Sequence, residues 1–362
     1  MNRPRIVQHS FGAPGSGGPI GVLGRLIDSP MSEKYEFIRL HQSAPFRGID
    51  YATILSWASR LRDADAEMIH VRGLGNEGFH AVAAARLAGL SRILVSIHGS
   101  QRDLATSRGL DRARKQVVAH GLEPLTLAGA THLATVCRFA ANRRFVRRHR
   151  RKLVGVVPNG VPVTTGLHVT GDRIRTEFDI PKSALVLAYV GRLSPEKGLS
   201  DFAAALRNIP SRIGDRPLHV VIVGSGPARA QLELEFTRST GAQAHFVGTR
   251  HDVPNILDAT DLFVFPTLHE NLSNALLEAM SRGVPVVATS VGGNTEVLEG
   301  GAGVLVPPSS PRQLGRAISN LLSNQSERSR LSRAGLTRVK DKYSLEAMLH
   351  GWDLVYQRTL SR

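Results

Sequence analysis

The sequence predicts an α/β protein of two domains, each built on an open and mainly parallel sheet. The chain has 362 residues, about twice the usual length of one domain. Short apolar runs alternate with helix-like segments along both halves, which is typical of parallel strands joined by crossover helices. With 42% hydrophobic and 21% charged residues, the composition is that of an ordinary globular protein.

The first half begins with a strand at Arg5–His9, a loop at Gly12–Gly18 and a helix at Ile20–Ile27. An Ala-rich stretch, Gly78–Leu90, is predicted as a helix that stops at Gly89. Four further short β-rich runs complete the expected sheet: Met68–Val71, Ile93–Ile97, His132–Val136 and Val154–Val157.

The second half repeats this alternation, and the turn-rich run Pro158–Pro162 separates the two halves. A final amphipathic helix is expected over Leu345–Leu360, with no strand after it. We therefore predict domains at residues 1–163 and 164–343, and a C-terminal helix within 344–362 that crosses back to the first domain. The strands expected in the second half are Leu185–Val190, His219–Val223, Ala244–Val247, Leu262–Phe265, Pro285–Ala288 and Gly303–Val306.

Open α/β sheets bind their ligands at the carboxyl ends of the strands. Two such domains are expected to face each other across a cleft. Five loops that follow predicted strands would then lie near one another: Gly12–Gly18, His98–Gly99, Gly191–Gly198, Gly224–Gly226 and Pro266–Asn274.

The loop Gly191–Gly198 carries two cations that suit a diphosphate. Its sequence is Gly-Arg-Leu-Ser-Pro-Glu-Lys-Gly, and it follows a strand directly. Arg192 offers a bidentate fork and Lys197 a point charge, and both can reach one point from either side of the loop. Taken alone, the segment also fits a solvated loop between a strand and a helix.

The loop after Leu262–Phe265 carries two glutamates, Glu270 and Glu278, the second of them in the helix that follows. Ser273 or Asn274 is a suitable N-cap for that helix, so backbone N–H groups and the helix dipole would face an anionic ligand. Glu270 could reach a reacting sugar, and Glu278 could accept hydrogen bonds from both hydroxyls of a ribose. Beside the Arg192/Lys197 loop, this pair becomes a strong signal.

These motifs resemble, in order and spacing, those of family 4 retaining glycosyltransferases (glycosyl transferases group 1), which have the GT-B fold of two Rossmann-like domains. The C-terminal motifs Gly191–Gly198, Glu270–Glu278, Gly283–Ala288 and Val291–Glu296 are the specific ones. The N-terminal ones are suggestive: a Gly17-Gly18 loop, Ser96–Gly99 and Val157–Val161. The resemblance extends over nearly the whole chain. Two departures from the commonest form are Asn271, often Gly, and Cys137, which we interpret as a packed small residue.

The resemblance implies a hexosyltransferase that moves a sugar from a nucleotide diphosphate sugar to a glycan or lipid-linked acceptor in bacterial surface or exopolysaccharide biosynthesis. It implies catalytic roles for Glu270, His98, Arg192 and Lys197, with the two cations neutralising the leaving diphosphate. It also implies that Glu278 holds the nucleotide ribose, and that no metal or other cofactor is needed. The remaining donor-binding residues that it implies are Gly17, Gly18, Asn271, Leu272 and Ser273.

Three alternatives stay open. The run Val221–Ala230 fits a dinucleotide fingerprint, but no acidic residue closes the next predicted strand, as a full Rossmann site requires. A nucleotide-sugar epimerase of GT-B fold would use the same diphosphate site without a separate acceptor. Donor binding without catalysis is the third.

Positive charge is concentrated in the first half of the chain, whose total net charge is +16. Residues 1–165 carry 24 basic and 11 acidic side chains. The segment Arg138–Lys152 holds eight Lys/Arg and no acid. On a helix, Arg143, Arg144, Arg147 and Arg148 would share one face, which predicts peripheral contact with an anionic membrane. Without interleaved aromatic residues, nucleic acid is not an expected partner.

The sequence favours a cytoplasmic protein, in part at the inner face of the membrane. Its longest apolar runs are far shorter than the roughly 20 residues of a membrane-spanning helix, and its start lacks an apolar signal core. A single cysteine agrees with a reducing compartment.

Overall fold

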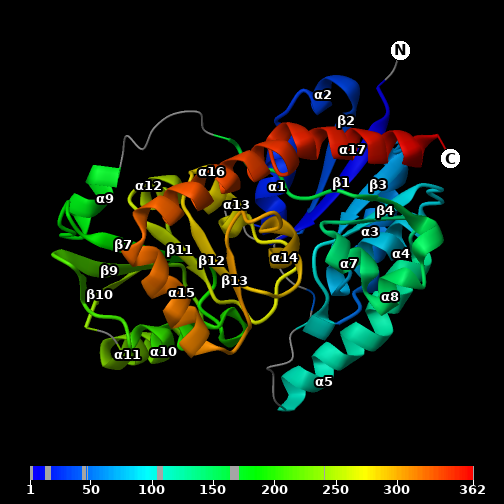
Figure 1. The fold of residues 1–362 in the computed structure, drawn as a ribbon. Helices are drawn as coiled ribbons and strands as arrows, with labels where there is room; N and C mark the ends of the chain where they lie inside the picture. Colours follow the sequence, from blue (N-terminus) through cyan, green and yellow to red (C-terminus); the bar gives the residue numbers. More distant parts are fainter. Residues whose placement is uncertain are drawn as a thin grey trace. The chain divides into compact units, whose positions relative to one another are not determined.

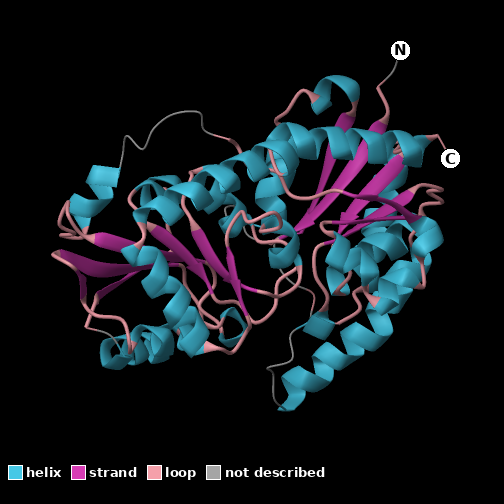
Figure 2. Cartoon of the chain, viewed as in Figure 1, coloured by secondary structure: helices cyan, strands magenta, loops and turns pink. Residues whose placement is uncertain are grey.

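A computed structural model describes residues 3–12, 18–42, 46, 48–103, 109–163, 171–239 and 241–361. The chain divides into two compact units, which are described separately (Figures 1 and 2). Unit 1 comprises Met1–Gly160 and Leu345–Arg362, and unit 2 comprises Val161–Ser344. The unit borders lie within three residues of the domain borders expected from the sequence.

Unit 1 is built on a six-stranded sheet whose paired strands all run parallel. The strand order is β2-β1-β3-β4-β5-β6, so the chain adds β2 on one side of β1 and β3 to β6 on the other. The strands are β1 Arg5–Phe11, β2 Glu36–Gln42, β3 Met68–Arg72, β4 Ile93–Ile97, β5 His132–Thr135 and β6 Leu153–Val156.

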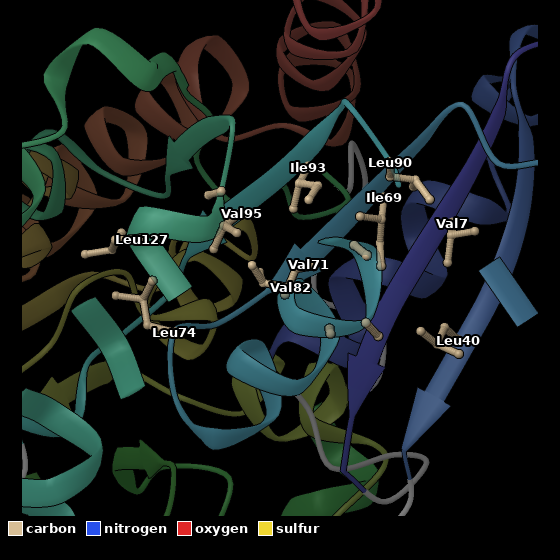
Figure 3. Packing of buried hydrophobic residues seen from close by; sticks show 14 of the residues in the cluster. Val7, Leu40, Ile69, Val71, Leu74, Val82, Leu90, Ile93, Val95 and Leu127 are labelled. Atoms are coloured by element: carbon tan, nitrogen blue, oxygen red, sulfur yellow. The ribbon is translucent and has the colours of Figure 1, made fainter. Parts of the chain in front are cut away.

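Helices cover both faces of this sheet and bury two separate apolar clusters. Figure 3 shows the first cluster, in which Val7, Ile69 and Val95 of the strands pack with Val82 and Leu127 of helices α4 and α6. The helices of unit 1 are α1 Gly18–Ile27, α2 Met31–Lys34, α3 Tyr51–Asp63, α4 Asn76–Leu87, α5 Gly109–Val117, α6 Glu123–Gly129, α7 Arg138–Asn142, α8 Arg144–Arg147 and α17 Leu345–Leu360.

The second cluster of unit 1 contains the last helix of the chain. In α17, Met348, Trp352, Val355 and Tyr356 are all at most 2% exposed and pack in a cluster that includes Ile6 of β1. A salt bridge of 2.7 Å from Lys34 Nζ to Asp353 Oδ2 fixes the same helix from outside the core. Helix α17 therefore completes the core of unit 1 although it follows unit 2 in the sequence (Figure 1).

Unit 2 is built on a second sheet with the strand order β10-β9-β7-β11-β12-β13, in which all neighbours are parallel. A short β8 (Arg212–Ile213) pairs antiparallel with β9. The other strands are β7 Leu185–Val190, β9 Arg216–Val223, β10 Gln243–Gly248, β11 Leu262–Phe265, β12 Val286–Thr289 and β13 Val304–Val306. The helices are α9 Gly171–Glu177, α10 Leu199–Leu206, α11 Arg229–Ser239, α12 Val253–Asp258, α13 Asn274–Ser281, α14 Gly293–Val297, α15 Pro311–Ser323 and α16 Gln325–Lys342.

The sequence did not predict β2, which pairs with β1 as an edge strand of the unit 1 sheet. An edge strand keeps many of its side chains in contact with solvent, and in β2 only Leu40 and Gln42 are fully buried. Its sequence therefore lacks the continuous apolar run by which a buried strand is predicted.

The segment Arg138–Lys152, whose arginines would share one face on a helix, is not one continuous helix. Arg143 has an extended backbone (φ −63°, ψ 137°) and separates α7 from α8, and a single 3-10 turn, Arg150–Lys152, follows. Lys152 Nζ turns inward and donates to the carbonyl oxygens of Leu127, Ala128 and Ala130 at 2.8–3.0 Å. After the break, Phe145 and Val146 of α8 are buried in the first apolar cluster of unit 1.

Candidate active site

The loop that follows β7 crosses the carboxyl edge of the unit 2 sheet and is held by the loop that follows β9. Gly191 N–H donates to the carbonyl of Val223 at 3.0 Å, and Leu193 N–H donates to that of Ser225 at 2.9 Å. A Cβ atom on Gly226 would lie 2.2 Å from the carbonyl oxygen of Leu193. The glycines of the apparent dinucleotide fingerprint therefore permit close packing of two loops.

The same loop is also bound to the one that follows β11. The carbonyl of Glu196 accepts from Leu268 N–H at 2.8 Å and from Thr267 Oγ1 at 3.2 Å. Gly198 has a φ of +67°, and a Cβ atom there would lie 2.0 Å from the carbonyl oxygen of Pro266. Glycine is thus required where the two loops meet, and these contacts fix the position of Lys197 between them.

Lys197 and Glu270, both predicted as catalytic residues, form an ion pair with each other. Lys197 Nζ lies 2.9 Å from Glu270 Oε2, and the two side chains are 19% and 17% exposed. The ammonium group also lies 5.8 Å from the centre of the Phe265 ring. Each charge therefore compensates the other at the carboxyl edge of the sheet, on the N-terminal side of α13.

Arg192 lies on the same loop as Lys197 and is exposed. Its carbonyl oxygen accepts a hydrogen bond of 3.0 Å from the buried Tyr189 hydroxyl. Burial, followed by the nearby charges of Glu270 and Glu196, raises the pKa of Tyr189 far above its usual range. The phenol therefore stays protonated and holds the backbone that carries the Arg192 side chain.

Helix α13 begins at Asn274, and its N-cap is Ser273, one of the two candidates that the sequence offered. Ser273 Oγ accepts from Leu276 N–H at 3.2 Å. Asn271 and Leu272 are buried just before the cap. Glu278 lies one turn into the helix and is partly buried.

A glycine-rich turn after β12 contacts the loop that joins β11 to α13. Gly293, at the start of α14, donates its N–H to the carbonyl of Glu270 at 3.3 Å. A Cβ atom on Gly293 would lie 1.7 Å from the carbonyl oxygen of Asn271, so no other residue fits there without moving the loop. Thr289 Oγ1 donates to the carbonyl of Thr267, which links the end of β12 to the same loop.

In unit 1, His98 follows β4 and is partly buried. Its Nε2 lies 3.1 Å from Ser96 Oγ. Burial and the positive charge of Arg72 lower the pKa of His98 to about 3, so the ring is neutral near pH 7. Gly17 lies outside the described residues, and Gly18 is the first residue of α1.

Sequence reasoning missed the buried polar residues behind His98. His70 and Arg72 of β3 are 0% and 2% exposed, and His70 bonds both Ser96 and Tyr356. The signal was present, since a histidine and an arginine interrupt the otherwise apolar strand Met68–Arg72. Buried charged residues require a partner, and here the partners come from a neighbouring strand and from α17.

The structure thus brings together Arg192, Lys197, Glu270 and Ser273 on adjoining loops of unit 2, and places His98 at the corresponding strand end in unit 1. Among the described residues, no group of three or more His, Cys, Asp or Glu side chains is arranged to hold a metal ion. Within the same part of the chain, no helix has the length and apolar character needed to cross a membrane.

Comparison with known proteins finds a family model that matches the part of the chain carrying these unit 2 loops. Residues 184–324 match the family model described as glycosyl transferases group 1. The chain is 28% identical over 289 residues to a putative teichuronic acid biosynthesis glycosyltransferase of Bacillus subtilis, covering 78% of this chain and 67% of the relative. It is 26% identical over 252 residues to the Escherichia coli UDP-Gal:alpha-D-GlcNAc-diphosphoundecaprenol alpha-1,3-galactosyltransferase, covering 68% of this chain and 63% of that protein.

The fold also matches solved structures. The Anabaena protein HepE in complex with UDP-glucose superposes with a TM-score of 0.79 at 16% identity, covering 99% of this chain and 100% of the other. Such a likeness shows the GT-B fold. The matched regions span about two thirds of the length of the two relatives above.

Proposed function

We propose that this chain, a glycosyltransferase of the GT-B fold whose residues 184–324 match the glycosyl transferases group 1 family, transfers a hexose-type sugar from a nucleotide diphosphate sugar with retention of the anomeric configuration. The observation that carries the proposal is the cluster of Arg192, Lys197 and Glu270 around the capped N-terminus of α13. Cations, a carboxylate and aligned N–H groups on two interlocked loops suit a sugar linked to a diphosphate.

In the proposed reaction, the bond between the anomeric carbon and the diphosphate oxygen breaks and a bond from that carbon to an acceptor oxygen forms. The diphosphate leaves with the bonding electrons, and its leaving oxygen takes up the proton of the acceptor hydroxyl. Arg192 and Lys197 stabilise the growing negative charge, and the N-terminus of α13 adds its dipole. The interlocked loops hold these groups in place before the substrate arrives, which lowers the reorganisation that the reaction requires.

Lys197 changes partner in this proposal. Without donor it is bonded to Glu270, and with donor it turns to the diphosphate while the Glu270 carboxylate accepts hydrogen bonds from the sugar hydroxyls. Glu278, partly buried one turn into α13, binds the ribose. The exchange keeps both charges compensated at every stage, which matters because both side chains are mostly buried.

The acceptor is proposed to be a glycan or a lipid-linked saccharide in bacterial surface or exopolysaccharide biosynthesis. The functions named for the two relatives, teichuronic acid biosynthesis and transfer to a diphosphoundecaprenol-linked sugar, support this choice. The exposed arginines of the basic segment Arg138–Lys152, Arg144, Arg147 and Arg148 among them, support a place at the inner face of an anionic membrane.

The test is a donor screen followed by an acceptor assay. UDP-, GDP- and ADP-sugars are added to the protein, and a rise in Tm identifies the donor, because a ligand that binds only the folded state stabilises it. Release of nucleoside diphosphate should then require an added lipid-linked or glycan acceptor. Interconversion of nucleotide-sugars without acceptor would instead indicate the epimerase, and a donor that binds without ever being turned over would indicate binding alone.

A further inference from the structure

Arg72, the last residue of β3, is a buried cation whose described neighbours carry no opposite charge. Its side chain belongs to a residue that is 2% exposed. Nη1 donates to the carbonyl of His9 at 3.3 Å, and Nη2 lies 3.3 Å from His70 Nδ1. Burial lowers the pKa of Arg72, and of the described residues only Tyr356 raises it. A nearby carboxylate would raise this pKa, so none of the described carboxylates compensates the charge.

An uncompensated charge of this kind is unfavourable inside a protein. Arginine stays protonated in proteins, so Arg72 cannot become neutral. A buried charge without an opposite charge destabilises the folded state. Unit 1 also contains the usual arrangement, because Arg102 forms a 3.4 Å ion pair with Glu123, whose side chain is 0% exposed. Arg72 lacks the counter-ion that Arg102 has.

The charge of Arg72 acts on the carboxyl ends of three adjacent strands. Burial, followed by the charge of Arg72, lowers the pKa of His9 in β1 and of His98 after β4, each to about 3. The same two causes, in the same order, lower the pKa of His70 in β3. The three strands are neighbours in the order β1-β3-β4. The positive field therefore covers the edge of the sheet at which open α/β folds bind ligands.

Space and an unused polar group lie beside Arg72. Gly73 follows it with a φ of +92°, and a Cβ atom built on Gly73 would have no neighbour within 4 Å. His9, whose carbonyl binds Arg72, is 0% exposed, and among the described residues neither of its ring nitrogens has a hydrogen-bond partner. Buried polar groups are normally paired. A positive field, open space and an unused imidazole together favour an anion with several oxygens.

We propose that the buried charge of Arg72 attracts a phosphate or diphosphate group of a substrate to the carboxyl edge of the unit 1 sheet, beside Gly73. Arg72 acts through its field, because so little of it is exposed, and the bound anion supplies the counter-ion that the protein lacks. Resting on the proposed function, this group is the diphosphate of the nucleotide-sugar donor or that of a lipid-linked acceptor.

The first test measures binding of inorganic pyrophosphate to the full-length Lys197→Met protein at low ionic strength. Lys197→Met weakens the proposed donor site of unit 2, and pyrophosphate carries neither sugar nor nucleoside, so a wrong transferase assignment would not affect the result. Pyrophosphate should raise the urea midpoint of unfolding. Adding Arg72→Gln should lower the pyrophosphate affinity about tenfold, and Arg72→Lys, which keeps the charge, should retain most of it. Absence of binding, or equal affinity with Arg72→Gln, overturns the proposal.

Stability without ligand separates this role from a structural one. In a buffer without phosphate or sulfate, Arg72→Gln should unfold at a urea midpoint no lower than that of wild type, because the cost of the uncompensated charge is removed. Arg102→Gln is the matched control. Loss of its ion pair with buried Glu123 should lower the midpoint and leave the pyrophosphate affinity unchanged. An Arg72→Gln protein that is less stable than wild type, or does not fold, shows that the charge is compensated and overturns the proposal.

Two soluble diphosphates distinguish the two sources of the group when Lys197 is intact. UDP carries the diphosphate of the donor, and geranyl diphosphate carries that of a lipid-linked acceptor. Calorimetric titration measures both affinities in wild type and in Arg72→Gln. A loss confined to UDP assigns the group to the donor, and a loss confined to geranyl diphosphate assigns it to the acceptor. Unchanged affinity for both ligands contradicts the proposal.

Discussion

Lys197 Nζ and Glu270 Oε2 lie 2.9 Å apart, although 73 positions separate the two residues in the sequence. Each neutralises the other at the place where a donor diphosphate would bind. The lysine must therefore leave the glutamate before it can bind a phosphate, so the pair competes with the ligand.

This competition predicts opposite effects on nucleoside diphosphate affinity. Glu270→Gln frees Lys197 and should raise the affinity for UDP, GDP or ADP about tenfold, equivalent to ~1.4 kcal/mol. The same variant should lose at least about a hundredfold in transfer, because the sugar loses its carboxylate partner. Lys197→Met should weaken the affinity and the transfer together. Calorimetric titration and a product-release assay measure the two quantities.

Glu233→Gln is the control for this pair of variants. Glu233 forms a 2.8 Å salt bridge with Arg229 that is more than 40% exposed on both sides, and it should change neither affinity nor transfer. Weaker diphosphate binding by Glu270→Gln would show that the ion pair assists binding and would contradict the proposed exchange of partners.

Gly293→Ala should weaken donor binding by displacing the loop that contains Asn271. The added Cβ would lie 1.7 Å from the carbonyl oxygen of Asn271, so the loop must move. We expect a destabilisation of ~1–3 kcal/mol and a clear loss of donor affinity, measured by urea unfolding and titration. Gly335→Ala in α16 is the control, since its nearest neighbour would be at 3.5 Å. Donor affinity equal to wild type in Gly293→Ala would show that the loop position does not matter for binding.

Removal of divalent metal should leave transfer unchanged. The proposed stabilisation of the leaving diphosphate uses Arg192, Lys197 and the N-terminus of α13. Rates measured after treatment with EDTA should equal those in added Mg²⁺ or Mn²⁺. A rate that falls with EDTA and returns with metal would show that a bound cation shares this role.

The triple variant Arg144, Arg147 and Arg148→Gln should weaken binding to anionic vesicles about a hundredfold, from roughly 1 kcal/mol for each arginine near the surface. Co-sedimentation with phosphatidylglycerol vesicles at low salt measures it. Replacing Arg312, Arg316 and Arg333, three exposed arginines of α15 and α16, removes the same charge from unit 2 and should have little effect. Equal losses in both variants would indicate attraction by net charge alone.

His9 should make the protein less stable in acid. Burial, followed by the charges of Arg72, His41 and His80, lowers its pKa to about 3, and among the described residues neither ring nitrogen has a hydrogen-bond partner. The unfolded chain binds a proton below the usual pKa of about 6.5 while the folded chain does not, so stability falls as pH drops from about 6.5 toward 3. By pH 5 this amounts to ~2 kcal/mol.

The measurement is urea unfolding at pH 7.5 and pH 5. His9→Leu should reduce the difference between the two values by about that amount, and the exposed His350→Gln should not. An undiminished pH dependence in His9→Leu would show that the ring is protonated in the folded protein at pH 5.

The sequence predicted most strands and the donor loops because buried parallel strands are apolar runs with glycine-rich ends. The strands β4, β7 and β11 and the helix α17 have the predicted bounds. Ser273 could be predicted as one of two candidate N-caps, because an N-cap depends on hydrogen bonds to residues close in the sequence. The Lys197–Glu270 pair could not be predicted, since it depends on how two distant loops meet. The break at Arg143 was also hidden, because charge periodicity does not show where Phe145 must be buried.

Helix α17 has a consequence for biosynthesis. Trp352 and Tyr356 belong to the core of a unit whose sheet is made from the first 160 residues, so a ribosome delivers the sheet long before the helix that covers it. During synthesis, one face of that sheet stays uncovered until translation ends. The side chains of Gln8 and His70 can form their hydrogen bonds to Tyr356 only at that point. Unit 2, whose residues are consecutive, can fold in the meantime. We therefore expect nascent chains stopped before residue 345 to contain a protease-resistant unit 2 beside an incomplete, chaperone-binding unit 1.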